Sequence, residues 1–205
     1  MTTAAELARA SAVLVLFHGR GHQPATMHEL VARLDLATVV CVAPGAPGNS
    51  WYPGRFMQPR ATNEPALSRA LEVVAATLDE VAAAGVDPAR IVLGGFSQGA
   101  CLTCEALARR PRRLGALAAL CGGLIGGDDD ELARPPAGSL DGVAVLLTGT
   151  EEDDWVPVER VRRTSQLLAA AGAAVDLHVH PPAEHRVHDE EIDALRALVR
   201  RVAGA

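Results

Sequence analysis

Arg90-Ile-Val-Leu-Gly-Gly-Phe-Ser-Gln-Gly99 is the most informative segment of this chain for its fold. Its apolar first half predicts a buried strand over residues 90–94, and a helical pattern follows from Ser97 to about Arg110. Between them, Gly95 to Gly99 matches G-x-S-x-G. At a sharp strand-to-helix turn the serine projects over the sheet edge, and flanking side chains would clash. Ser97 is therefore a candidate nucleophile; the alternative is a glycine-rich turn with an incidental serine.

Apolar runs alternate with helical patterns on both sides of this stretch. Further strands are expected at 12–17, 38–42, 114–121, 143–147 and 174–180, and further helices at 27–34, 65–81, 157–171 and 192–199. Strands joined by helical crossovers predict an α/β fold, with a mostly parallel central sheet and helices on both faces. No long linker divides the 205 residues, so we expect a single domain over 1–205.

Composition excludes several classes of protein. With 49% hydrophobic residues the chain is not disordered, and its net charge of −6 disfavours a nucleic-acid binder. The first ten residues contain Glu6 and no apolar segment typical of a signal peptide. The longest weakly polar stretch, 114–127, is too short to span a membrane. The four cysteines are expected to be free thiols, so we predict a cytoplasmic protein with no membrane span.

A serine nucleophile needs a base, and the base needs an acid that orients it. In folds with this serine turn the chain order is serine, acid, histidine. Acidic residues at 151–154 follow the predicted strand at 143–147, and His185 follows the last strand. Both positions lie at the sheet edge where open α/β folds bind ligands.

An oxyanion hole is the next requirement of such chemistry. The backbone N–H of Gln98, directly after the serine, lies at a helix N-terminus. The turn Phe17-His-Gly-Arg-Gly-His22 follows the first strand, and its glycines allow the N–H of Arg20 to approach a substrate. His18, within this turn, is expected to make a structural hydrogen bond.

At this point several motifs, in order, resemble the phospholipase/carboxylesterase family of α/β-hydrolases, which includes bacterial carboxylesterases and acyl-protein thioesterases and lies near dienelactone hydrolases. They are Leu16-Phe-His-Gly-Arg-Gly21, Trp51-Tyr-Pro53, Asn63-Glu-Pro65, Asp87 to Gly99, Gly122-Gly-Leu-Ile-Gly126 and Asp153-Asp-Trp-Val-Pro157. The resemblance implies an α/β-hydrolase fold without a large cap domain, and a serine hydrolase without a cofactor.

Carried over residue by residue, the resemblance implies Ser97 as nucleophile, Asp153 as acid and His185 as base. It places the oxyanion amides on Arg20 and Gln98. Two departures stand out: Asp154 occupies a position that is usually proline, and Pro181-Pro-Ala-Glu184 precedes the base where a glycine-rich turn is usual. Asp153 and Asp154 therefore both remain candidates for the acid.

Aromatic residues make up only 3% of the chain, and several lie on predicted loops. We expect Trp51, Phe56 and Trp155, with His22, to line the substrate pocket. Tyr52 is a further candidate for the wall of this pocket, and for Tyr52 and Phe56 packing of a long loop onto the core is the alternative.

The histidines at 180, 185 and 188 invite a metal-site interpretation, but their spacing matches no helical metal motif, so we predict no metal. The predicted function is hydrolysis of small-molecule carboxylic esters with small or medium acyl or aryl groups. A thioesterase or lysophospholipase acting on long acyl chains, a metal-dependent hydrolase and a non-catalytic binding module of the same fold are the alternatives. The sequence leaves the oligomeric state open.

Overall fold

The computed structural model describes residues 2–129 and 131–204, and its sheet is parallel throughout these ranges. The strands are β1 (Ala12–Phe17), β2 (Val39–Val42), β3 (Ile91–Phe96), β4 (Ala116–Leu120), β5 (Ala144–Thr150) and β6 (Ala174–His180). They pair in the order β2-β1-β3-β4-β5-β6, each parallel to its neighbours. The α/β prediction is confirmed.

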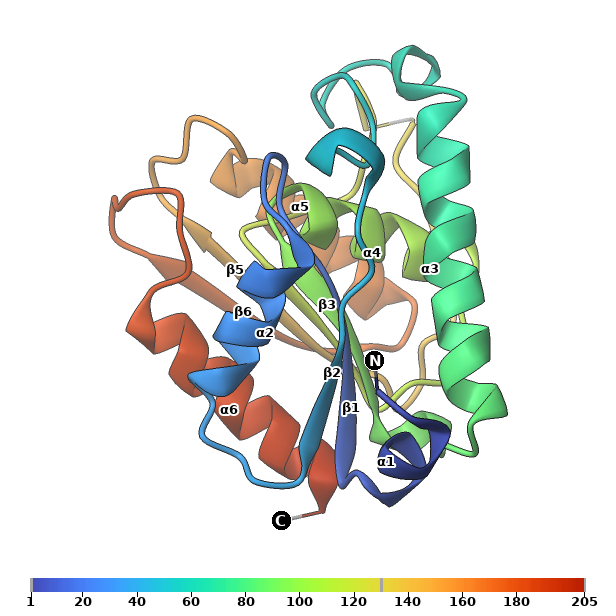
Figure 1. Cartoon of the computed structure of the whole chain (residues 1–205). Helices are drawn as coiled ribbons and strands as arrows, with labels where there is room; N and C mark the ends of the chain where they lie inside the picture. Colours follow the sequence, from blue (N-terminus) through green and yellow to red (C-terminus); the bar gives the residue numbers. More distant parts are fainter. Residues whose placement is uncertain (1, 130, 205) are drawn as a thin grey trace.

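Helices cover both faces of the sheet (Figure 1). Helices α2 (Pro24–Ala32) and α6 (Asp189–Ala203) pack on one face. Helices α3 (Ala66–Ala83), α4 (Gln98–Arg109) and α5 (Val158–Ala170) pack on the other. The loops also contain short 3-10 helices, namely η1 (Pro47–Asn49), η2 (Arg60–Asn63) and η3 (Pro88–Arg90). No helix of the described ranges is both long and apolar enough to cross a bilayer.

An additional helix, α1 (Ala4–Arg9), was not predicted from the sequence pattern. It is only six residues long and buries only Leu7, so it carries no periodic apolar face. A capping box between Thr3 and Glu6 begins it, with the two residues satisfying each other's backbone N–H groups.

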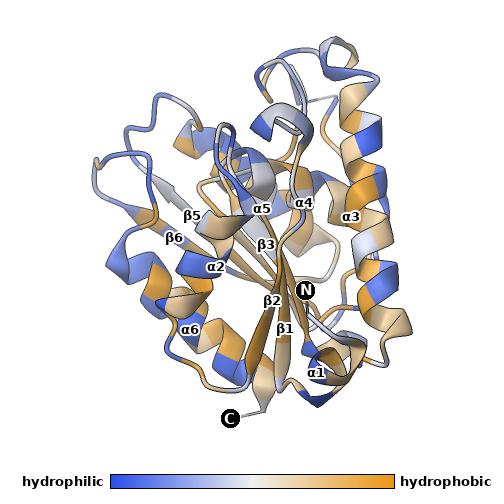
Figure 2. Cartoon of the chain, in the orientation of Figure 1, coloured by the Kyte–Doolittle hydropathy of each residue, from blue (hydrophilic) through white to orange (hydrophobic). Residues whose placement is uncertain are grey.

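The central strands are apolar throughout because both of their faces are buried. In β1, Val13, Val15 and Phe17 pack against the α3–α5 side, whereas Leu14 and Leu16 pack against the α2–α6 side. Figure 2 shows these strands in orange between helices whose outer faces carry more blue. The edge strands β2 and β6 are less buried. Continuous apolar runs therefore mark the centre of the sheet.

The chain adds β2 on one side of β1 and then crosses to the other side, where β3 and the later strands follow in order. The switch between the two directions lies between the neighbouring strands β1 and β3. The loops that follow these two strands diverge there, because β2 lies on one side and β4 on the other. In open α/β sheets this switch point, at the carboxyl ends of the strands, is where ligands bind. The predicted Ser97 turn and the Arg20 turn leave the sheet at this place.

Candidate active site

Ser97 occupies a strained backbone conformation between β3 and α4, with φ 53° and ψ −117°. Its N–H donates to the Leu120 carbonyl at 2.9 Å, and its own carbonyl accepts from the Cys101 N–H at 2.9 Å. A Cβ atom on Gly99 would lie 2.8 Å from the carbonyl oxygen of His18. Close approach of the backbone therefore requires glycine, as the G-x-S-x-G pattern predicts.

Three side chains from separate loops meet above this turn. His185 Nε2 lies 2.8 Å from Ser97 Oγ, and His185 Nδ1 lies 2.7 Å from Asp153 Oδ2. Asp153 follows β5 and His185 follows β6, so the two loops extend from adjacent parallel strands. The arrangement links a hydroxyl, an imidazole and a carboxylate in one chain of hydrogen bonds, which is the geometry of nucleophilic catalysis.

Asp153, and not Asp154, is the acid of this arrangement. Its side chain is 1% exposed, and its Oδ1 accepts the N–H groups of Trp155 at 2.8 Å and Val156 at 3.0 Å. Burial raises its pKa, but the hydrogen bonds from His185 and these two amides outweigh burial, so the net pKa lies below its usual value. Asp154 is exposed, and its backbone carbonyl accepts from Arg55 at 3.1 Å.

Of the two amides predicted for the oxyanion hole, that of Arg20 lies in the turn after β1 and that of Gln98 on the first residue of α4. Neither the Arg20 nor the Gln98 backbone N–H donates to an acceptor within the described ranges. The Gln98 side chain joins the loops: its Oε1 accepts the Trp51 N–H at 3.0 Å, and its Nε2 donates to the Tyr52 carbonyl at 2.8 Å. Both N–H groups thus remain available to an oxygen of a substrate.

A cleft of about 600 Å³ opens at Ser97 and His185. Three of the predicted pocket residues, His22, Phe56 and Trp155, line it. Several other lining residues carry no direct signal in the sequence pattern, namely Arg55, Gln58, Phe96, Cys101 and Val156. Of these, Phe96 could have been predicted most readily, because it is the variable residue before the serine in the G-x-S-x-G motif. The centre of its ring lies 5.1 Å from that of His185 and 5.7 Å from that of His22, on which it stacks.

Trp51 does not line the cleft, so this part of the pocket prediction is wrong. The residue is 4% exposed and packs edge-on against Phe17, with ring centroids 5.2 Å apart. Its indole N–H donates to the His18 carbonyl at 2.8 Å, which satisfies the polar edge of the ring inside the core. Its neighbour Tyr52 is also buried but contributes to the cleft lining.

His18 makes the structural hydrogen bonds expected of it. The ring is fully buried, with Nδ1 2.8 Å from the Gly19 carbonyl and Nε2 accepting the Ala46 N–H at 3.1 Å. His18 thereby holds the turn that carries Arg20.

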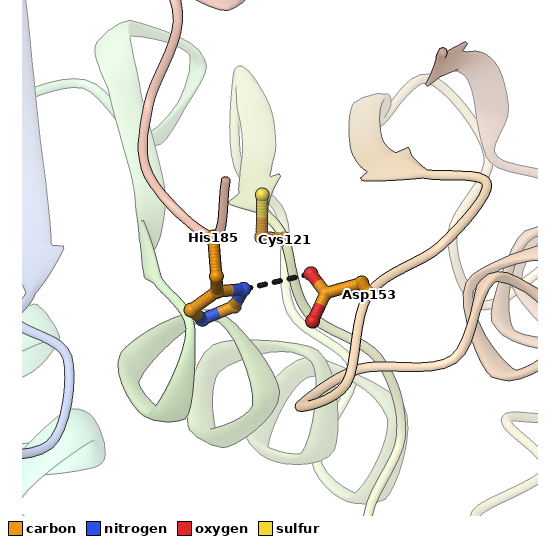
Figure 3. Close-up of side chains that lie close together, drawn as sticks. All are labelled: Cys121, Asp153 and His185. Atoms are coloured by element: carbon orange, nitrogen blue, oxygen red, sulfur yellow. Dashed lines mark hydrogen bonds and ion pairs between the residues drawn. The ribbon is translucent and has the colours of Figure 1, made fainter. Parts of the chain in front are cut away.

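Cys121, Asp153 and His185 are the one group of three metal-type side chains in the described ranges, with ligand atoms within 4.8 Å of one another (Figure 3). Burial raises the pKa of the Cys121 thiol well above its usual value, and its sulfur lies 3.5 Å from Glu191 Oε1. A protonated thiol is a poor metal ligand, and the facing Asp153 and His185 atoms already bond to each other. His188 lies apart from this group, with Nε2 2.9 Å from the Glu184 carbonyl.

Comparison with known proteins agrees with this geometry. A model of the family described as phospholipase/carboxylesterase matches residues 2–202. The crystal structure of a phospholipase/carboxylesterase from Dyadobacter fermentans superposes with a TM-score of 0.86 and 36% identity, covering 94% of this chain and 91% of that one.

Two curated proteins show weaker sequence similarity. Acyl-protein thioesterase 1 of Gibberella zeae is 32% identical over 117 residues, covering 57% of this chain and 50% of that protein. A probable carboxylesterase of Oryza sativa is 29% identical over 133 residues, covering 64% of this chain and 49% of that protein. The chain thus spans about half the length of the curated relatives it matches.

Proposed function

Because the chain belongs to the phospholipase/carboxylesterase family of α/β-hydrolases, we propose that it hydrolyses carboxylic esters of small or medium acyl or aryl groups through an acyl-enzyme. One observation carries the proposal: Ser97 Oγ lies 2.8 Å from His185 Nε2, and Asp153 holds the other ring nitrogen at 2.7 Å.

In the first step Ser97 Oγ attacks the ester carbonyl carbon while His185 Nε2 accepts the serine proton. The developing negative charge on the carbonyl oxygen is stabilised by the backbone N–H groups of Arg20 and Gln98. Loss of one such donor typically costs about 10²- to 10³-fold in kcat. Asp153 keeps the proton on Nδ1, so that Nε2 is the basic nitrogen, and stabilises the imidazolium that forms.

Collapse of the tetrahedral intermediate breaks the bond to the alcohol, which leaves with the proton held on His185. Water then attacks the Ser97 ester, with His185 acting again as the base, and the carboxylic acid is released. The proton of Ser97 leaves with the alcohol, and a proton of the attacking water passes through His185 back to Ser97, so the enzyme is regenerated unchanged.

The cleft supports esters of modest size. Aromatic rings of Phe56, Phe96 and Trp155 contribute to its lining, and its volume of about 600 Å³ falls in the range of small-molecule sites. The similarity to an acyl-protein thioesterase makes long-chain esters and thioesters the second candidate. A series of esters and thioesters from acetyl to palmitoyl distinguishes the two, since the proposal expects kcat/KM to peak at short or medium chains.

The serine assignment is tested by labelling with a fluorophosphonate, which reacts only with an activated serine. We expect labelling of the wild-type protein, none of Ser97→Ala, and wild-type labelling of Ser165→Ala, which changes a serine on α5 remote in sequence from the site. Ser97→Ala should lower kcat by about 10⁶. Ester hydrolysis retained by Ser97→Ala would refute the proposal.

We also propose that the protein works in a reducing compartment such as the cytoplasm, and its cysteines support this. Cys41, Cys101, Cys104 and Cys121 are all free thiols.

A further inference from the structure

Two arginines that line the cleft, Arg20 and Arg55, have no carboxylate partner in the described ranges. Arginines elsewhere on the surface, such as Arg112 with Asp79 and Arg163 with Asp129, form ion pairs. A guanidinium is charged at every physiological pH, so each of the two cleft arginines carries a positive charge that forms no ion pair.

Arg20 is fixed in place by neutral acceptors. Its guanidinium donates to the carbonyls of Pro53 at 2.9 Å and Gly54 at 2.6 Å, and to Ser50 Oγ at 3.1 Å. It also lies 5.9 Å from the centre of the Tyr52 ring. These contacts join the turn after β1 to the cleft wall at 52–54, and they leave the charge of Arg20 beside the oxyanion amides.

Arg55 is exposed and less constrained. One of its terminal nitrogens donates to the backbone carbonyl of Asp154 at 3.1 Å, and its guanidinium lies 5.6 Å from the centre of the Trp155 ring. The other guanidinium nitrogens bond to no partner in the described part of the chain. An arginine that stacks on an aromatic ring keeps its remaining donors in a planar fork that matches a carboxylate.

The nearest carboxylates lie beside the cleft and form no ion pair with either arginine: Asp153 bonds to His185, and Asp154 is exposed. None of the described residues lining the cleft is aspartate or glutamate, although the chain as a whole has a net charge of −6. The N-terminus of α4, a helix of 12 residues, also begins at the cleft and adds partial positive charge. Two arginines without ion pairs and a helix N-terminus therefore line the cleft of an acidic protein, and positive groups so placed attract anions.

From this arrangement we infer that the enzyme acts preferentially on esters that carry a carboxylate in their acyl or alcohol part, with Arg55 binding that carboxylate and Arg20 adding electrostatic attraction. The inference rests on the proposed ester hydrolysis and specifies its substrate class.

The test compares esters matched in shape and different in charge. For the acyl side, the 4-nitrophenyl monoester of succinate is paired with 4-nitrophenyl 4-methylpentanoate, its neutral isostere. For the alcohol side, 4-butyryloxybenzoate is paired with its neutral carboxamide analogue. The readout is the ratio of kcat/KM for the anionic ester to that for the neutral ester, measured on the full chain.

We expect a ratio of about 10 or more in at least one pair at low salt, because a charge-assisted hydrogen bond discriminates strongly against an uncharged group. Raising the ionic strength from about 0.01 M to about 0.5 M should lower it by screening. Arg55→Gln should reduce the ratio about 5- to 20-fold, and Arg55→Glu should reduce it further. The control Arg200→Gln, which removes one positive charge at the far end of α6, should keep the wild-type ratio.

Ratios near one in both pairs for the wild-type protein would overturn the inference. So would an Arg55→Gln variant that loses activity equally on both members of a pair, because that result describes a purely structural contact with Trp155. Failure of the proposed function looks different: no ester of either charge would then be hydrolysed in a Ser97-dependent manner. Fluorophosphonate labelling of each variant establishes that its active site is folded.

Discussion

Thr148, in β5, donates its hydroxyl to the carboxylate of Glu191 in the first turn of α6. The same carboxylate accepts the His188 N–H at 2.9 Å and lies 3.5 Å from Cys121 Sγ, and Glu191 is 1% exposed. Glu191 therefore connects the end of the loop that carries His185 to strand β5.

Removing this buried acceptor should destabilise the fold. Glu191→Ala leaves the Thr148 and His188 donors unpaired, which should lower the free energy of unfolding by at least about 1–3 kcal/mol. Urea unfolding measures the change. Glu190→Gln, an exposed carboxylate on the same turn, should change it by less than about 0.5 kcal/mol. Equal losses of unfolding free energy for the two substitutions would show that the hydrogen bonds of Glu191 do not stabilise the fold.

Backbone strain at Ser97 predicts an effect on stability that is separate from catalysis. With φ at 53°, a residue with a Cβ is strained there, whereas glycine is not. Ser97→Gly should therefore be more stable than Ser97→Ala by about 1 kcal/mol. Both variants lack the hydroxyl, so the comparison isolates the backbone. A lower thermal midpoint for the glycine variant would argue against strain at this position.

The two adjacent aspartates should differ sharply in turnover. Asp153→Asn should lower kcat by about 10⁴, because an amide favours the wrong tautomer of His185. Asp154→Asn should change kcat by less than about threefold, since an exposed side chain outside the hydrogen-bonded chain does not orient the base. Steady-state kinetics on one ester gives both numbers. The opposite ranking would move the acid one position along the loop.

The lowered pKa of Asp153 links its hydrogen bonds to acid stability. A carboxylate whose folded pKa is depressed contributes stability that is fully present above its unfolded pKa, near 4, and is lost as the pH falls through the folded value. The difference in unfolding free energy between wild type and Asp153→Asn should thus narrow below about pH 4. Denaturant unfolding across this range measures it, and a difference independent of pH would contradict the assigned hydrogen bonds.

Substitutions of the two tryptophans should differ in their effect on stability, because Trp51 is buried and Trp155 is exposed. Trp51→Ala removes a ring that is 4% exposed and should cost about 3–5 kcal/mol of stability. Trp155 is 60% exposed, so Trp155→Ala should cost less than about 1 kcal/mol and act instead on KM. Thermal unfolding and kinetics together test the assignment, which fails if Trp51→Ala is as stable as wild type.

Much of the fold follows from local signals in the sequence. The continuous apolar run at 12–17 and the alternating pattern at 174–180 coincide with β1 and β6, and the G-x-S-x-G stretch predicts the turn between β3 and α4. A strand buried on both faces, such as β1, must be apolar throughout, whereas a half-exposed edge strand such as β6 alternates. A turn with such close backbone contacts accepts only glycine.

Local signals in the sequence are thus enough to predict the alternation of strands and helices, the serine turn and the order in which serine, acid and histidine follow one another. Contacts between distant segments determine that Asp153 rather than Asp154 bonds to His185, and that Tyr52 rather than Trp51 lines the cleft. They also place both Arg20 and Arg55 in the lining of this cleft. Loop residues follow no fixed period, so the direction of each side chain depends on backbone angles set by contacts between segments far apart in the chain.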